Sequence, residues 1–274
     1  MRNHQKYEID HWITKNGVHI PILRQPVFKG HTAKETRNIL KNSQKGNESH
    51  LAFSNAKKMA RMNHIDLDVS IKEPIDEDVL ITQVQSLRDI ADEFPQVEEF
   101  LKKHNQKLAL KVEAFKASDK LGDHTSNVSS ADTDPSTNVI CLNSKSEQFK
   151  GTLEECVEAS LKFGKKHKWG NGVLSTNELG HTAVHEFGHI MQNVLADKLG
   201  DSKSEVRGEI LQIAMGKCGL KEKPRNISSY GNKNDSELIS ECIADAYFNG
   251  KNANKFSIEI YNYMKRKLGK KGVK

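Results

Sequence analysis

The sequence predicts an α+β protein in which helices outnumber strands. Apolar residues recur at helical spacing over several long segments, whereas short stretches with the apolar pattern of strands are few. The 274 residues suffice for one large domain, or for a medium-sized domain with an attachment. Because apolar residues make up 36% of the chain and charged residues 28%, we expect a modest core under a heavily charged surface.

Residues 1–48 are predicted to form a β-hairpin appendage and a linker. Two stretches rich in strand-forming residues flank Asn16-Gly17, a dipeptide typical of two-residue hairpin turns. Residues 30–48 are polar and rich in Gly, Asn and Lys, which is typical of a linker. The main domain then covers residues 49–274. The hairpin resembles short appendages of phage head-associated proteins.

The main domain is predicted to contain two strands and several helices. Apolar residues occupy every second position from 107 to 115, which predicts a strand, and a short apolar run predicts another at 138–143. The segment between them, 117–137, is rich in Ser, Asp, Thr and Asn and is predicted to be a loop. Apolar periodicity predicts helices at 50–64, 76–94, 96–105 and 152–163, the last of them starting with the capping box Thr152-x-x-Glu155.

A longer helix is predicted to begin near Ser175 and to end before Gly200. Ser175 and Glu178 form an S-x-x-E capping box, and glycine is a natural residue to follow the last turn of a helix. The apolar residues that recur at helical spacing between them are Leu179, Ala183, Val184, Phe187, Met191, Val194 and Leu195.

This helix carries His185-Glu186-Phe187-Gly188-His189, an H-E-x-x-H motif. Imidazoles four residues apart lie on one helix face, where they can hold one Zn²⁺. Glu186 lies beside the first imidazole and can take a proton from a zinc-activated water, as in metal-assisted hydrolysis. The alternative is an ordinary amphipathic helix whose two histidines have their hydrogen bonds satisfied and bind no metal. Gly188 costs such a helix about 1 kcal/mol relative to alanine, a cost that makes sense where another backbone or a substrate approaches closely.

A zinc site of this kind needs a third protein ligand. The extended motif with a third histidine is excluded, because Gln192 and Leu195 stand where it requires Gly and His. Glu209 is one remaining candidate, although residues 201–209 are polar and look like a loop or a helix edge. Glu237, further along the chain, is the other.

Glu237 lies in a helix predicted to begin near residue 235, with Asn234 as its cap. Glu241 follows four residues later, so the two carboxylates share one face. Burying both is costly unless a positive group lies opposite them, and Zn²⁺ with its histidine ligands supplies one. A solvated acidic face is the alternative. Ligand imidazoles generally need a partner on their other nitrogen, which gives Glu241 a physical role.

Residues 230–241 read Y-G-x-x-N-x-x-E-x-x-x-E. Together with H-E-F-G-H, this signature resembles the catalytic domain of anthrax lethal factor and the lethal factor-like zinc metalloprotease domains of bacterial toxins and phage-borne proteins. The resemblance covers about residues 135–250. It implies a zincin-like fold, in which a small twisted sheet packs against the helix of the motif. It also implies that the strand at 138–143 lies antiparallel to a bound peptide.

The resemblance further implies a role for each residue of the site. Zn²⁺ would be held by His185, His189 and Glu237, with Glu186 as general base, Tyr230 as hydroxyl donor to the developing oxyanion and Glu241 orienting a ligand imidazole. We therefore expect a zinc metallopeptidase, an endopeptidase acting on a protein or peptide substrate, encoded by a phage or mobile element or acting as a toxin-like effector. The alternative is a phage structural or morphogenesis protein that keeps an inactive metalloprotease-like scaffold.

Charge and hydropathy restrict the other partners. The net charge is +6, and basic clusters at 162–168 and 265–271 are interpreted as solvated surface. Nucleic acid is not expected as a partner, because no aromatic residues alternate with the basic residues of these clusters and no zinc-finger signature accompanies them. No apolar run approaches the roughly 18 residues that cross a bilayer, so no membrane partner is expected.

The cysteines and the N-terminus bear on the compartment. The four cysteines form no C-x-x-C pair and are expected to be buried small hydrophobes in a reducing environment. The N-terminus leads into no apolar segment of the kind found in signal peptides. We expect the protein in the cytoplasm of the producing cell, in a virion, or delivered by a non-classical route. The sequence leaves the substrate and the oligomeric state open.

Overall fold

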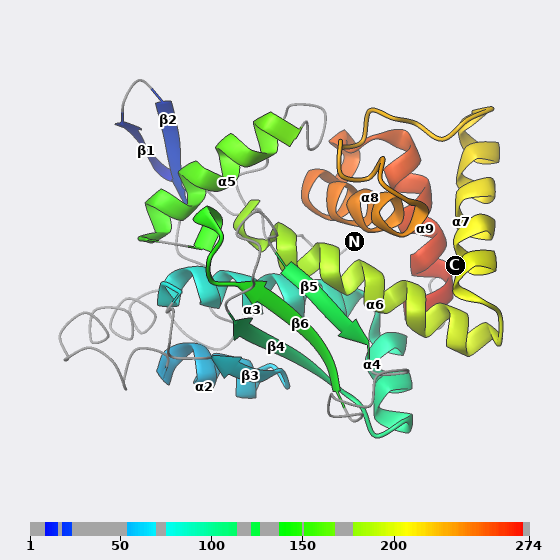
Figure 1. Ribbon diagram of the computed structural model, residues 1–274, viewed down its shortest axis with the longest axis horizontal. Helices are drawn as coiled ribbons and strands as arrows, with labels where there is room; N and C mark the ends of the chain where they lie inside the picture. The colour runs from blue at the N-terminus through cyan, green and yellow to red at the C-terminus, as the bar shows by residue number, and fades with distance from the viewer. Residues whose placement is uncertain are drawn as a thin grey trace.

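The computed structural model describes residues 9–15, 18–23, 54–69, 75–113, 122–126, 137–149, 151–167 and 178–270 (Figure 1). Over these residues the chain is rich in helices and contains one small sheet and a separate hairpin. The predicted α+β class is confirmed at this level. The buried apolar side chains of the helices and the sheet form a continuous core.

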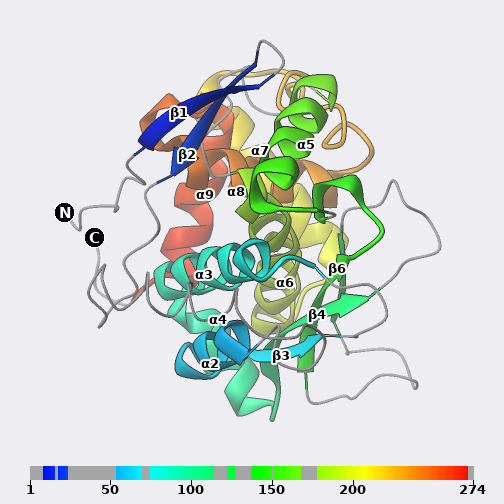
Figure 2. The same ribbon diagram turned by 90° about the vertical axis from the view of Figure 1, so that its left-hand side faces the viewer.

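The small sheet has four strands in the order β3-β4-β6-β5 (Figure 1), and Figure 2 shows β3, β4 and β6 from another side. β3 (Asp66–Val69), β4 (Lys107–Glu113) and β6 (Thr137–Asn143) run parallel, and β5 (Gly122–Ser126) pairs antiparallel with β6. The two predicted strands are therefore present. Their buried apolar side chains are Leu108, Leu110, Val112, Ile140 and Leu142.

The predicted loop at 117–137 is wrong in part, because it contains β5. Gly122–Ser126 has no apolar alternation, and its order comes from main-chain pairing with β6, which apolar periodicity does not report. β6 is consequently an interior strand with a neighbour on either side. The expectation that 138–143 pairs with a bound peptide is therefore wrong, since both of its hydrogen-bonding edges are taken.

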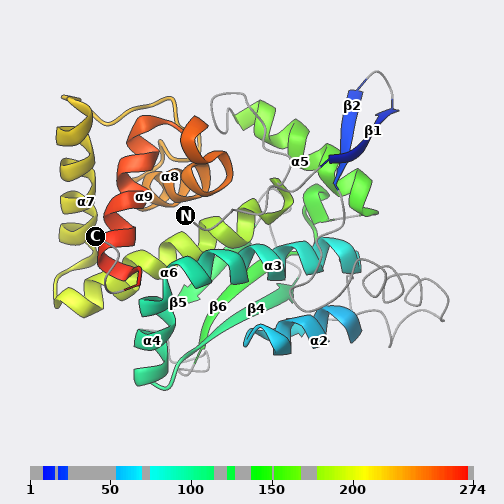
Figure 3. The same cartoon turned by 180° about the vertical axis from the view of Figure 1, so that it is seen from behind.

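One helix lies at the centre of the molecule, between the sheet and the C-terminal helices. α6 (His181–Leu199) contacts β5 and β6 on one side and α8 (Asp235–Asn249) on another, and α3 (Glu77–Glu93) packs along it (Figure 3). The other helices are α2 (Ser54–Met62), α4 (Pro95–Lys103), α5 (Leu153–His167), α7 (Lys203–Cys218) and α9 (Lys255–Leu268), with 3-10 turns at η1 (Glu147–Phe149), η2 (Glu178–Gly180) and η3 (Gly250–Asn252). The helices predicted before residue 170 are thus confirmed, with shifted ends.

The N-terminal hairpin is also confirmed. β1 (Ile9–Lys15) and β2 (Val18–Leu23) pair antiparallel, with Lys15 opposite Val18. The turn residues, the linker at 30–48 and the proposed boundary at residue 48 lie outside the described residues. No helix within the described ranges has the length and apolar character needed to cross a membrane. Cys141, Cys156 and Cys242 are buried and Cys218 is partly buried, as expected of small hydrophobes, and none of the four is in a disulfide among the described residues.

The central helix begins later than predicted, and its cap comes from a different helix. Ser175 lies outside the described residues, Glu178 belongs to η2, and α6 starts at His181 without a side-chain cap of its own. Instead, the buried Gln83 of α3 accepts a hydrogen bond from the backbone N–H of Ala183 at 3.2 Å and donates to the carbonyl of Leu179. A residue one hundred positions before Ala183 therefore satisfies one orphan backbone N–H of this terminus and the carbonyl of Leu179.

Replacing Gln83 by leucine is expected to lower the free energy of unfolding by about 2–5 kcal/mol. The substitution keeps the size of the side chain but leaves one backbone N–H and one C=O buried without partners, each costing about 1–3 kcal/mol. Urea denaturation measures the difference. Gln85→Leu on the same helix is the control, since the partly buried Gln85 bonds only locally to Asp89, and should cost less than about 1 kcal/mol. Equal losses in the two variants would contradict the capping role.

Candidate metal centre

The candidate site lies where the central helix crosses α8. At Gly188 of α6 a Cβ atom would lie 3.1 Å from the Cα of Ser240, a tighter contact than Cβ atoms usually make, so glycine favours this close approach of the two helices. The close approach expected at Gly188 is therefore confirmed, and it comes from another backbone. α6 ends where predicted, at Gly200, whose φ of 74° is the left-handed conformation that glycine adopts readily.

The start of α8 holds the third candidate ligand. Asn234 caps the helix, accepting a hydrogen bond from the backbone N–H of Glu237 at 2.9 Å, so the predicted start near residue 235 is confirmed. Glu237 thereby sits in the first turn, facing α6. Its side chain remains 18% exposed, in contrast to the almost fully buried His185 and His189, so the cluster is reached from the Glu237 side.

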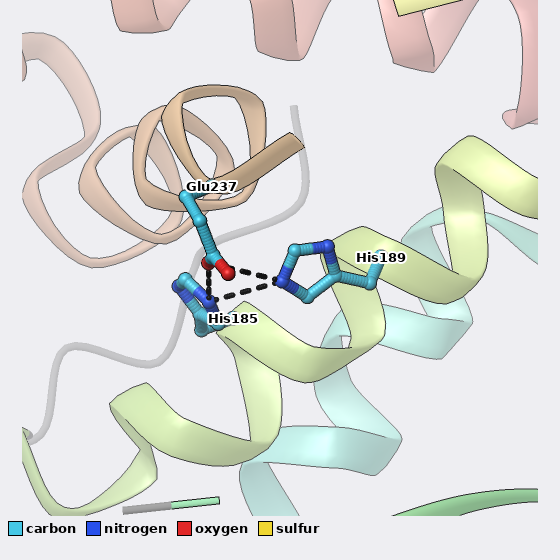
Figure 4. Close-up of side chains that lie close together, drawn as sticks. All are labelled: His185, His189 and Glu237. Atoms are coloured by element: carbon cyan, nitrogen blue, oxygen red, sulfur yellow. Dashed lines mark hydrogen bonds and ion pairs between the residues drawn. The ribbon is translucent and has the colours of Figure 1, made fainter. Parts of the chain in front are cut away.

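Three ligand atoms converge at this crossing (Figure 4). The Nε2 atoms of His185 and His189 lie 3.2 Å apart, and Oε2 of Glu237 lies 3.0 Å from the first and 3.2 Å from the second. A tetrahedral Zn²⁺ with bonds of about 2.0–2.1 Å separates its ligand atoms by about 3.3 Å. Within the described part of the chain, these three residues form the group able to hold a metal ion.

The other nitrogen of each imidazole lies against a polar partner, a carboxylate at ion-pair distance for His185 and a hydroxyl at hydrogen-bond distance for His189. Nδ1 of His185 lies 2.7 Å from Oε1 of the buried Glu241, and Nδ1 of His189 lies 2.9 Å from Oγ of Ser236. Both rings therefore turn Nδ1 toward an outer partner and Nε2 toward the centre, as metal-binding histidines do. Glu241, which the resemblance assigns to orienting a ligand imidazole, thus lies against His185. Ser236 was not anticipated, because no spacing rule marks a serine that precedes a ligand.

A polar network extends from Ser236 away from the centre. The Ser236 hydroxyl donates to Oε1 of Gln192 at 3.2 Å, and Nε of Arg207 donates to the same oxygen at 2.9 Å. Gln192 in turn donates to Oγ of Ser240 at 3.0 Å. Since the single hydroxyl proton of Ser236 goes to Gln192, its oxygen is left to accept from His189. Gln192, whose presence excluded the three-histidine motif, therefore helps to fix the second imidazole.

The charges of the cluster are strongly coupled. Burial by itself lowers the pKa of His185, but hydrogen bonds to Glu237 and Glu241 outweigh it and raise that pKa to about 10. Burial by itself raises the pKa of the Glu237 and Glu241 carboxyls. The neighbouring histidines nevertheless hold the pKa of both below its usual value. The site thus keeps two carboxylates ionised and attracts positive charge.

Metal binding to this site is expected to release about one proton and to strengthen as pH rises. A metal ligand must be a neutral imidazole, whereas a His185 pKa of about 10 keeps the metal-free ring protonated at neutral pH. The apparent zinc affinity should therefore rise about tenfold per pH unit around neutrality. Competition with a chromophoric chelator at several pH values measures this slope. An affinity independent of pH would contradict the assignment.

A further histidine lies one turn before the motif. The His181 ring stacks on that of His185 with centroids 5.9 Å apart, and its Nε2 lies 3.9 Å from Oε1 of Glu241. Burial lowers the pKa of His181 to about 4, so this ring is neutral at neutral pH. Sequence analysis did not single out His181, although its position four residues before His185 places it on the same helix face.

The two predicted catalytic residues stand beside the cluster. Glu186 is buried in α6 next to His185, and its charge helps to raise the pKa of that imidazole. The ring of Tyr230 lies edge-on to the ring of His185, and the two ring centroids are 5.8 Å apart. Nζ of Lys233 lies 3.8 Å above the Tyr230 ring, so a positive charge accompanies the phenol. Glu186 and Tyr230 therefore both lie next to His185 of the candidate metal cluster.

The alternative ligand, Glu209, lies elsewhere. Residues 203–218 form the regular helix α7, which starts with a capping box between Ser202 and Glu205, so of the two expectations for 201–209, a loop or a helix edge, the loop is wrong. Four buried residues attach this polar helix to the core: Val206, Ile210, Leu211 and Ala214. Glu209 accepts a hydrogen bond from the hydroxyl of Tyr263 at 2.8 Å and is no member of the metal-binding group.

Comparison with known proteins adds no relative. No model of a known protein family matches the chain, and no curated protein matches it. The fold and the site therefore define the class: a helix-rich α+β protein with a two-histidine, one-glutamate cluster suited to a metal ion.

Proposed function

We propose that this protein is a zinc-dependent endopeptidase of the lethal factor-like type, with a zincin-like fold. The observation that carries the proposal is the convergence of Nε2 of His185, Nε2 of His189 and Oε2 of Glu237 within 3.2 Å. Two further contacts fix the imidazoles, from Glu241 and Ser236. A chance pair of histidines on a helix would not acquire both a shared carboxylate and separate Nδ1 partners.

The donor set favours zinc over other ions. Two imidazole nitrogens and one carboxylate are the ligand set of many catalytic zinc sites, whereas Mg²⁺ and Ca²⁺ prefer sites made of oxygen alone. When bound, Zn²⁺ acts as a Lewis acid that polarises a carbonyl and brings the pKa of water to about 7. The partial exposure of Glu237 leaves access to the cluster from that side.

The chain's own residues divide the work of peptide hydrolysis. Glu186 takes the proton of the attacking water and passes it to the leaving amine. Tyr230 donates its hydroxyl to the oxygen on which negative charge develops. β5, at the edge of the sheet and in contact with α6, offers main-chain groups to an extended substrate peptide, because among the described strands it pairs with β6 alone.

A cleavage assay with an unbiased substrate tests the proposal. The zinc-loaded protein is incubated with a mixture of denatured proteins, and new termini are identified by mass spectrometry, with and without a chelator. Chelator-sensitive cleavage supports the endopeptidase, encoded by a phage or mobile element or acting as a toxin-like effector. Zinc binding without any cleavage would instead favour the phage structural protein on an inactive scaffold.

A further inference from the structure

A pocket of about 1060 Å³ lies beside the candidate metal centre. Its walls come from α7, from residues between 221 and 234, and from the start of α8. Ser236 belongs to the pocket wall and also holds the imidazole of His189, so the two sites share a residue. Small-molecule pockets typically have volumes of about 300–1,000 Å³. The pocket of this protein is at the upper end of that range, which suits a segment of a peptide.

The charged side chains that line the pocket are mostly basic. Lys223 pairs with Asp235, which neutralises one basic and one acidic group. The one acidic side chain left is Glu222. The basic side chains left are Arg207, Lys221, Arg225 and Lys233. A concave surface with this excess of cations attracts anions and raises their local concentration.

Arg207 is the best-placed anchor in this pocket. It is partly buried, and its Nε donates to Gln192, so the plane of the guanidinium is fixed. Among the described residues no carboxylate forms an ion pair with its terminal nitrogens. Burial lowers the pKa of Arg207, while the charges of Asp235 and Glu237 act on it in the opposite sense. A fixed, partly desolvated guanidinium fork is matched by a carboxylate, which it can bind through two parallel hydrogen bonds.

We propose that the pocket binds a carboxylate of the substrate peptide on the His189 side of the metal centre, with Arg207 as the residue that determines this specificity. The inference rests on the proposed endopeptidase function and names its substrate class: acidic peptides. The carboxylate belongs to an Asp or Glu side chain or to the C-terminus of the substrate. Nucleic acid fits less well, because the lining contains no aromatic side chain on which a base could stack.

Binding and cleavage of matched peptide libraries test the inference. Fluorescent libraries are made with Asp and Glu, with Asn and Gln in their place, and with a free or an amidated C-terminus. Binding is measured by anisotropy on the zinc-loaded Glu186→Gln chain, and cleavage on the chain with Glu186 intact. We expect the acidic library to bind about tenfold or more tightly than the neutral library, because one hydrogen-bonded pair with a charged group contributes about that factor. Loss on amidation alone identifies the C-terminal carboxylate.

Variants separate recognition from support of the metal centre. Arg207→Gln should reduce the preference to threefold or less, whereas a purely structural role, through Gln192, would weaken all libraries equally and leave the ratio unchanged. Lys221→Gln tests the pocket without breaking the bond to Gln192, and should reduce the preference partially. Arg61→Gln, at an exposed position on α2, is the matched control and should change nothing.

Each result is decisive for one of the two proposals. Equal binding of the acidic and neutral libraries, or no binding of either, overturns the acidic pocket. Tighter binding of an oligonucleotide than of the acidic library, with a steep salt dependence, overturns it in favour of nucleic acid. An acidic preference in binding without cleavage by the zinc-loaded protein supports the pocket and rejects the endopeptidase.

Discussion

Replacing Glu237 by alanine is expected to leave the purified protein with little or no zinc. The substitution removes the one charged member of the three ligand atoms and leaves two imidazoles, too few for a tight site. Loss of an outer partner alone typically weakens metal binding 10–100-fold, so loss of a ligand should weaken it by more than about 100-fold. Metal content by mass spectrometry, beside about one zinc per chain in the unmodified protein, measures the effect.

The control for this experiment is Glu209→Ala. Glu209 competes with Glu237 on sequence grounds, but its carboxylate accepts from Tyr263 on α9, so its removal should leave the zinc content unchanged. Folding should survive in Glu237→Ala, because Asn234 caps α8 through the backbone N–H of residue 237, which alanine retains. Zinc lost only in Glu209→Ala would reject the assigned ligand set. Zinc absent from every form, even after it is supplied, would reject the metal centre.

The parts of the site that lie within one helix were predictable. The spacing of His185 and His189 places both imidazoles on one face, and Asn234 followed by Glu237 predicts a cap in which the glutamate occupies the first turn. The choice between Glu237 and Glu209 was not settled by local physics, since both lie on helices after the motif. The resemblance favoured Glu237, and the crossing of α6 and α8 at Gly188 supplies the physical reason.

The parts built by long-range contacts were not predictable. The cap of α6 comes from Gln83 on α3, and a distant side chain leaves no signal beside the terminus it caps. β5 is polar and owes its place to main-chain bonds with β6, so apolar periodicity assigned it to a loop. Ser236 supports His189 only because α8 approaches so closely at Gly188. Each of these features depends on how the helices and strands pack, which a single sequence does not specify.

Replacing Glu186 by glutamine is expected to lower the rate of peptide cleavage about 10²–10⁴-fold, the usual contribution of a general base. Glutamine has the same shape but cannot take a proton, so zinc should be retained and the buried position should still be filled. Turnover of a substrate from the cleavage assay measures the loss, and metal content shows that the centre remains. Glu209→Gln makes the same chemical change away from the cluster and should keep full activity.

This pair of variants separates an enzyme from a scaffold. A protein that uses the cluster only to hold its fold needs His185, His189 and Glu237, but has no use for a proton acceptor beside them. Cleavage that persists in Glu186→Gln would therefore point to a contaminating protease or to another base. Loss of both zinc and cleavage would make Glu186 a support of the metal centre. Loss of cleavage with zinc retained is the outcome that only the endopeptidase predicts.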